Sequence, residues 1–98
     1  MALLYCDPSH RNHVILRYGD QVQDLHQPKA EELLRAIVEL TDQQPVEGIS
    51  LVNRSDSFTL IRVLATIANA LAYSCHWKLY DGDTLVTQLQ PQYSKPAL

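Results

Sequence analysis

A polar segment, Asn53-Arg54-Ser55-Asp56, separates two apolar stretches and is the first place in this sequence where chemistry is conceivable. An apolar run at 49–52 precedes this elbow, and an apolar stretch at 57–74 follows it. A strand, a tight turn and a helix in this order form a junction at which α/β proteins often bind a ligand. The side chains at 54–56, however, obstruct the close backbone approach that a phosphate requires, and Asp56 adds a negative charge beside a helix N-terminus. The elbow therefore favours a helix cap over a nucleotide site.

The residues Asp7, His10 and His13 form a second group that could hold a metal or transfer protons. The H-x-x-H spacing is unspecific, and residues along a strand alternate between its two faces. Ser9, beside His10, lacks the orienting base that a nucleophile needs. The sequence therefore predicts no catalytic residue, no metal ligand and no cofactor. An enzyme built on Asp7 and the histidines stays a lesser alternative.

The composition limits the class of protein. The chain has 98 residues, of which 8 are basic and 11 acidic, and its formal net charge of −3 argues against broad binding to phosphate backbones. No run of about 18 apolar residues is present, and the segment 1–11 has no basic region before an apolar core, so we expect neither a membrane span nor a signal peptide. Cys6 and Cys75 lack CxxC spacing, which predicts reduced, half-buried core cysteines of a cytoplasmic protein.

Hydrophobic periodicity predicts three antiparallel strands, a helix, a strand, a second helix and a fifth strand, with a possible sixth. Glycine at the first position of Gly19-Asp20 suits a type II′ hairpin turn. Residues 1–90 are expected to form a single lobe, and the proline-containing segment 91–98 a flexible tail. The strands are expected at 2–6, 13–18, 21–25, 49–52, 76–80 and 84–89, and the helices at 29–42 and 57–74.

The order β-β-β-α-β-α-β resembles the ribonuclease-H-like fold of the actin, sugar kinase and Hsp70 ATPase superfamily. Within it, Ser57-Phe58-Thr59 followed by Arg62 resembles the G-P-G-S-F-T-G-x-R signature of the TsaB (YeaZ) family, and the likeness extends over residues 2–80. The resemblance implies an α/β single lobe with a mixed sheet of five to six strands and two helices. Residues 54–56 and Leu60 depart from the signature, which has glycine-proline-glycine and a further glycine there, and the sequence stops where the family's second lobe would begin.

TsaB is the non-catalytic partner of TsaD in the synthesis of threonylcarbamoyladenosine (t6A) on tRNA, and its two helices pack against those of TsaD or of a second TsaB. The resemblance therefore implies a non-enzymatic interaction subunit that pairs with a TsaD-like protein or forms a homodimer. It would meet tRNA only indirectly, through that complex. The alternative is a small nucleotide- or RNA-binding module that uses residues 53–57.

The second expected helix gives an independent reason to predict such an interface. Its few polar positions leave it apolar around most of its circumference, so it needs cover on two sides. Arg62 is a lone cation there and could pair with Glu31, with Glu32 or with a partner's carboxylate. The other possibility is that the first helix, the sheet and the C-terminal segment cover the helix within one chain. The predicted interface residues are Leu33, Ile37, Arg62, Leu64, Ala65, Ile67, Ala68, Leu71 and Ala72.

Overall fold

The computed structural model describes residues 2–9, 13–42, 44–54 and 58–90. Within these residues, strands and helices follow one another in the predicted order. The largest differences lie late in the chain, where the fifth strand begins at Lys78 instead of His76 and the sixth ends at Val86 instead of Leu89. The elements are β1 (Leu3–Asp7), β2 (His13–Tyr18), β3 (Gln21–His26), α1 (Ala30–Thr41), β4 (Gly48–Leu51), α2 (Phe58–Cys75), β5 (Lys78–Asp81) and β6 (Thr84–Val86).

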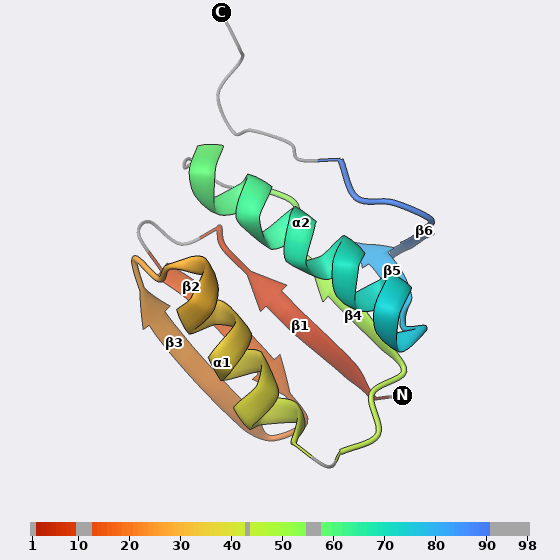
Figure 1. Ribbon diagram of the computed structural model, residues 1–98, viewed down its shortest axis with the longest axis horizontal. Helices are drawn as coiled ribbons and strands as arrows, with labels where there is room; N and C mark the ends of the chain where they lie inside the picture. Colours follow the sequence, from red (N-terminus) through yellow and green to blue (C-terminus); the bar gives the residue numbers. More distant parts are fainter. Residues whose placement is uncertain (1, 10–12, 43, 55–57, 91–98) are drawn as a thin grey trace, which may run out of the picture.

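The strands form one mixed sheet with the order β3-β2-β1-β4-β5-β6. The strands β1, β4 and β5 are parallel neighbours, whereas the β1–β2, β2–β3 and β5–β6 pairs are antiparallel. Both helices cross the same face of this sheet, α1 beside β2 and β3 and α2 beside β4 and β5 (Figure 1). The predicted α/β single lobe with a mixed sheet and two helices is therefore confirmed, and the possible sixth strand is present.

Two glycines allow the tight hairpin turns of the sheet. Gly19 joins β2 to β3 with a φ of 60°, and Gly82 joins β5 to β6 with a φ of 63°. Asp20 has no positive φ, so the first turn has the glycine-first geometry of type II′ that the sequence predicts. This turn sets the register of the hairpin, in which Tyr18 lies opposite Gln21.

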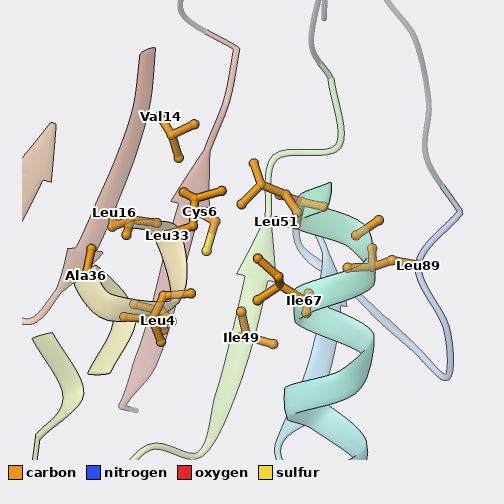
Figure 2. Close-up of a cluster of buried hydrophobic side chains, with 14 of the residues drawn as sticks. Leu4, Cys6, Val14, Leu16, Leu33, Ala36, Ile49, Leu51, Ile67 and Leu89 are labelled. Carbon is orange, nitrogen blue, oxygen red and sulfur yellow. The ribbon is translucent and has the colours of Figure 1, made fainter. Parts of the chain in front are cut away.

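The hydrophobic core lies between the helices and the sheet (Figure 2). Alternate residues of each strand point into it, which brings Leu4 and Cys6 of β1 together with Val14 and Leu16 of β2. The remaining core residues come from both helices, from β4 and β5 and from the segment after β6: Leu33, Ala36, Ile37, Leu40, Ile49, Leu51, Ile61, Leu64, Ala65, Ile67, Ala68, Leu79 and Leu89.

One side of α2 is apolar and buried within this chain, and the other side faces outward. The buried side carries Ile61, Leu64, Ala65, Ile67 and Ala68. The outward side carries Thr59, Arg62, Thr66, Ala70 and Tyr73, most of which are polar or small. The helix composition by itself therefore calls for no second covering layer, contrary to the expectation from the sequence. No helix in the described part of the chain is long and apolar enough to cross a membrane.

The segment after β6 is held against α2 instead of continuing as a strand. The side chain of Leu89 is only 2% exposed and belongs to the core, where it lies against α2 (Figure 2). The amide of Asn69 holds the backbone of this residue: Leu89 N donates to Asn69 Oδ1 at 2.8 Å, and Asn69 Nδ2 donates to Leu89 O at 3.2 Å. This pair of hydrogen bonds explains why the strand predicted to reach residue 89 ends at Val86.

The two cysteines have different surroundings. Both are free thiols, as predicted, but Cys6 is buried in the core and Cys75, at the end of α2, is exposed. The prediction that both are half-buried core residues is therefore wrong for Cys75. Burial raises the pKa of the Cys6 thiol to about 12, because the thiolate would lose its hydration.

Candidate protein-interaction site

The first part of the elbow is a structural junction. The side chain of Asn53 is buried, and its Nδ2 donates to Asp81 Oδ2 at 3.2 Å and to the Gln90 carbonyl oxygen at 2.6 Å. These hydrogen bonds join the end of β4 to the end of β5 and to the last described residue of the chain. The rest of the elbow, at 55–57, lies outside the described residues, so the alternative nucleotide site has no described geometry there.

The histidines and acidic residues near the start of the chain form hydrogen-bonded pairs at the surface. The carboxylate Oδ1 of Asp7 accepts hydrogen bonds from Ser9 N at 2.9 Å and from Ser9 Oγ at 2.5 Å. His13 Nδ1 lies 2.8 Å from Asp24 Oδ1, and its ring centroid is 4.8 Å from that of His26. His10 lies outside the described residues. Among the described residues, no group of three or more His, Cys, Asp or Glu side chains could hold a metal ion.

A shallow groove runs between the first turns of α1 and the first half of α2. It consists of two adjoining hollows of about 440 and 400 Å³, and Ala30, Thr59 and Val63 line both of them. We call this feature the helix groove and define it by Ala30 of α1 and by Thr59, Arg62, Val63 and Thr66 of α2. The lining combines apolar side chains with two threonines and with two basic residues, Lys29 at the start of α1 and Arg62 on α2.

Two exposed apolar residues of α1 extend the apolar surface beside this groove. Leu34 is 42% exposed and Val38 is 62% exposed, although both belong to the apolar pattern of the helix. They follow Ala30 at intervals of four residues, so the three side chains lie in one row along the same side of α1. Leu34 and Val38 therefore belong to the surface available to a partner.

Arg62 is the only charged residue in the described length of α2. It is exposed, and among the described residues no ion pair joins it to Glu31 or Glu32 of α1. The two glutamates are themselves exposed at the first turn of α1. A partner's carboxylate can therefore reach Arg62 without displacing an ion pair between the helices.

The residues that the sequence predicts for an interface divide into two groups. Most of them are core residues within this chain: Leu33, Ile37, Leu64, Ala65, Ile67 and Ala68. Leu71 and Ala72 are partly buried and pack against that core, and Arg62 is exposed. The first group faces the sheet and presents almost no side-chain surface, so contact with another protein is left to Arg62, Leu71 and Ala72 and to residues that the sequence reasoning did not select.

The sequence predicts neither Leu34 nor Val38 as an interface residue, but the width of the apolar stripe on α1 could have indicated them. The pattern Ala30, Leu33, Leu34, Ile37, Val38 and Thr41 covers more of the circumference than one sheet face can bury. The structure buries the Leu33–Ile37 side and leaves Leu34 and Val38 outside. A stripe of this width indicates a second contact surface, although it does not say which edge of the stripe is exposed.

The sheet order and the two helices on one face define a single lobe of the ribonuclease-H-like fold. The solved structure of YeaZ from Pseudomonas aeruginosa is similar to this lobe, with a TM-score of 0.62 and 21% sequence identity. The match covers 80% of this chain but 41% of the YeaZ chain, so the chain spans less than half the length of that protein. At this identity the likeness shows the fold alone. No protein-family model matches the chain, and no curated protein matches it either.

Proposed function

We propose that this chain is a non-catalytic interaction subunit similar to TsaB, which pairs with a TsaD-like protein through its helix groove. Its role would be to hold that partner in a competent state for t6A synthesis on tRNA in the cytoplasm, with tRNA meeting only the complex. The observation that carries the proposal is the helix groove, with its exposed apolar edge, on a lobe that has the YeaZ fold.

The chemistry of the groove specifies the partner surface. Ala30, Val63 and the exposed edge at Leu34 and Val38 favour apolar side chains of a helix, because burying apolar area is the main favourable term in association. Arg62 favours an acidic residue near the end of that helix, since it has no carboxylate partner on α1. A partner helix with an apolar stripe and one carboxylate beside it would satisfy both demands.

The test measures binding of a purified TsaD-like protein from the same organism by calorimetry or sedimentation. Val38→Asp and Thr66→Arg place charge or bulk at exposed positions of the two helices, so both variants should fold and weaken binding about tenfold or more. Leu64→Asp and Ala68→Arg, at two of the interface residues that the sequence predicts, change buried side chains and would report folding instead.

The matched control is Val22→Lys on β3, which is also an exposed valine but lies on the sheet face away from the helices. It should leave binding to the TsaD-like protein unchanged. A wild-type chain that ignores this partner, or a loss of binding in Val22→Lys but not in Val38→Asp, would refute the assignment of the helix groove.

A further inference from the structure

The sheet face opposite the helices carries exposed apolar side chains. Strand residues alternate between the two faces, so the neighbours of the core residues on β1, β3 and β6 point away from the helices. Among them, Tyr5 is 46% exposed, Val22 55% and Leu85 61%. The described helices both lie on the other side (Figure 1). No helix of the described residues covers this face, which we call the open face, although parallel strands such as β1, β4 and β5 are usually covered on both faces.

The strand register aligns the residues of the open face into one row across the sheet. Arg17 pairs with both Val22 and Tyr5 across β3-β2-β1, and Ser50 pairs with both Tyr5 and Tyr80 across β1-β4-β5. Leu85 completes the row through its pairing with Tyr80. In spatial order the row reads Val22, Arg17, Tyr5, Ser50, Tyr80, Leu85. With strands about 4.8 Å apart, it is roughly 24 Å long.

We propose that the open face binds a second copy of this chain, with a two-fold axis parallel to the strands between β1 and β4. This axis lies at the middle of the six-stranded sheet, so it superimposes the whole row on its own reverse. The row is complementary to its reverse. Tyr5 falls opposite the small Ser50 of the second copy, Arg17 opposite Tyr80, and Val22 opposite Leu85.

Each of these three contacts has a physical basis. The Tyr5 ring would lie against the backbone and side chains around Ser50, which is itself only 5% exposed and donates its hydroxyl hydrogen bond to the Gly82 carbonyl oxygen at 2.8 Å, so no polar group of Ser50 loses a partner. The exposed guanidinium of Arg17 can lie over the Tyr80 ring, which is a cation–π arrangement. Val22 and Leu85 bury apolar surface against each other. The two-fold axis makes each contact twice, as isologous pairing requires.

The charges on this face favour a second copy over a polyanion. Arg17 and Lys78 are its basic groups near the row, and Asp7 and Asp24 are acidic groups on the same face. A nucleic acid would meet both carboxylates, whereas a second copy places opposite charges and apolar groups on the two sides of one contact.

The size of the face predicts a weak dimer. A row of roughly 24 Å and strands of about 17 Å give a footprint on the order of 400 Å² in projection. Stable interfaces bury about 800 Å² of accessible surface on each partner, and smaller ones are transient. The association should therefore depend on concentration and appear in sedimentation velocity at high protein concentration.

The test compares the mass of the full chain and its variants over a concentration series. Tyr5→Lys, Val22→Lys and Leu85→Glu should each raise the dissociation constant about tenfold or more. An equimolar mixture of Val22→Lys and Leu85→Glu should regain association, because one Lys–Glu pair and one intact Val22–Leu85 pair form in the mixed dimer. Circular dichroism establishes that each variant is folded, and the two exposed edge variants keep the test valid if Tyr5→Lys unfolds.

Val38→Asp on α1 is the control, and it should leave this self-association unchanged. A chain that stays monomeric at every concentration would overturn the proposal. So would association that persists in all three sheet-face variants or is lost only in Val38→Asp, which would assign self-pairing to the helix groove. Failure of the mixed variants to associate would refute the two-fold pairing. None of these results depends on whether the helix groove binds a TsaD-like protein.

Discussion

The two hydrogen bonds between Asn69 and Leu89 are expected to hold the segment after β6 against α2, and this can be tested by mutation. Replacing Asn69 with alanine removes both hydrogen bonds to the backbone of Leu89. Each is worth about 0.5–1.5 kcal/mol net, and the freed backbone groups are only partly buried, so water can satisfy them in part. Alanine returns roughly 0.5 kcal/mol of helix propensity. We therefore expect Asn69→Ala to lower the free energy of unfolding by about 1–2 kcal/mol.

The chain's single tryptophan makes this loss measurable at the right place. Trp77 lines a hollow together with Asn69, Val86 and Thr87, so its fluorescence reports the contact between α2 and the segment after β6. Urea unfolding followed by tryptophan fluorescence and by circular dichroism gives the change in free energy. The matched control is Thr66→Ala, which changes an exposed residue of the same helix and isolates the gain in helix propensity.

A thermodynamic cycle with Leu89→Ala sharpens the interpretation. Leu89→Ala should cost about 2–3 kcal/mol, since the side chain is buried at the margin of the core. If Asn69 acts by holding that residue in place, its loss should cost little once the leucine side chain is gone. An Asn69→Ala variant as stable as Thr66→Ala would show that the Asn69 amide does not hold the segment after β6. If the costs of Asn69→Ala and Leu89→Ala simply add in the double variant, then Asn69 does not act by holding the Leu89 side chain in the core.

Two further predictions concern the sheet and the cysteines. Gly48→Ala should destabilise the lobe by about 1–3 kcal/mol, because the added Cβ would lie 2.6 Å from the Lys78 carbonyl oxygen. The strand β5 cannot move away without losing its pairing with β4. A denaturant midpoint unchanged from wild type would contradict this prediction. At pH 8 a thiol reagent should modify Cys75 alone, and both cysteines after unfolding, with Cys75→Ser abolishing the native reaction. Burial raises the pKa of Cys6 from 9.0 to about 12, so the thiol of the unfolded chain loses its proton at a lower pH than the folded one. The free energy of unfolding should therefore fall as the pH rises from 9 towards 12. The same fall in Cys6→Ala, or no fall in the wild-type chain, would count against this cause.

The sheet order was accessible from the sequence because local patterns encode most of it. The alternation at 13–18 and the glycine at position 19 specify the β2–β3 hairpin, and the structure places its strands and turn as predicted. The end of the sixth strand was not accessible in this way. Its limit depends on Asn69, which is distant in the sequence and binds the backbone of Leu89 through an amide that no local pattern assigns.

The proposed interaction surface was harder to predict for a different reason. Apolar composition shows that a residue can be buried, but it does not distinguish burial in one chain from burial between two. Leu64 and Ala68 were selected for their apolar or small side chains and lie in the core, whereas Val38 has the same character and is exposed. Only the position of each helix relative to the sheet decides between these outcomes, and that position results from packing of the whole lobe.

The location of the two proposed surfaces on opposite faces of one sheet constrains how they can be used together. Pairing of two copies through the open face leaves both helix grooves directed outward, so each copy can still bind a TsaD-like protein and the assembly closes as two pairs. If copies associated through both faces, every new copy would present another unpaired face, and the assembly would continue to grow instead of closing. A closed assembly therefore requires the two faces to bind different partners. The charges agree with this division: the row on the open face complements its own reverse, whereas the helix groove has Arg62 beside it and no carboxylate on α1 that pairs with this residue.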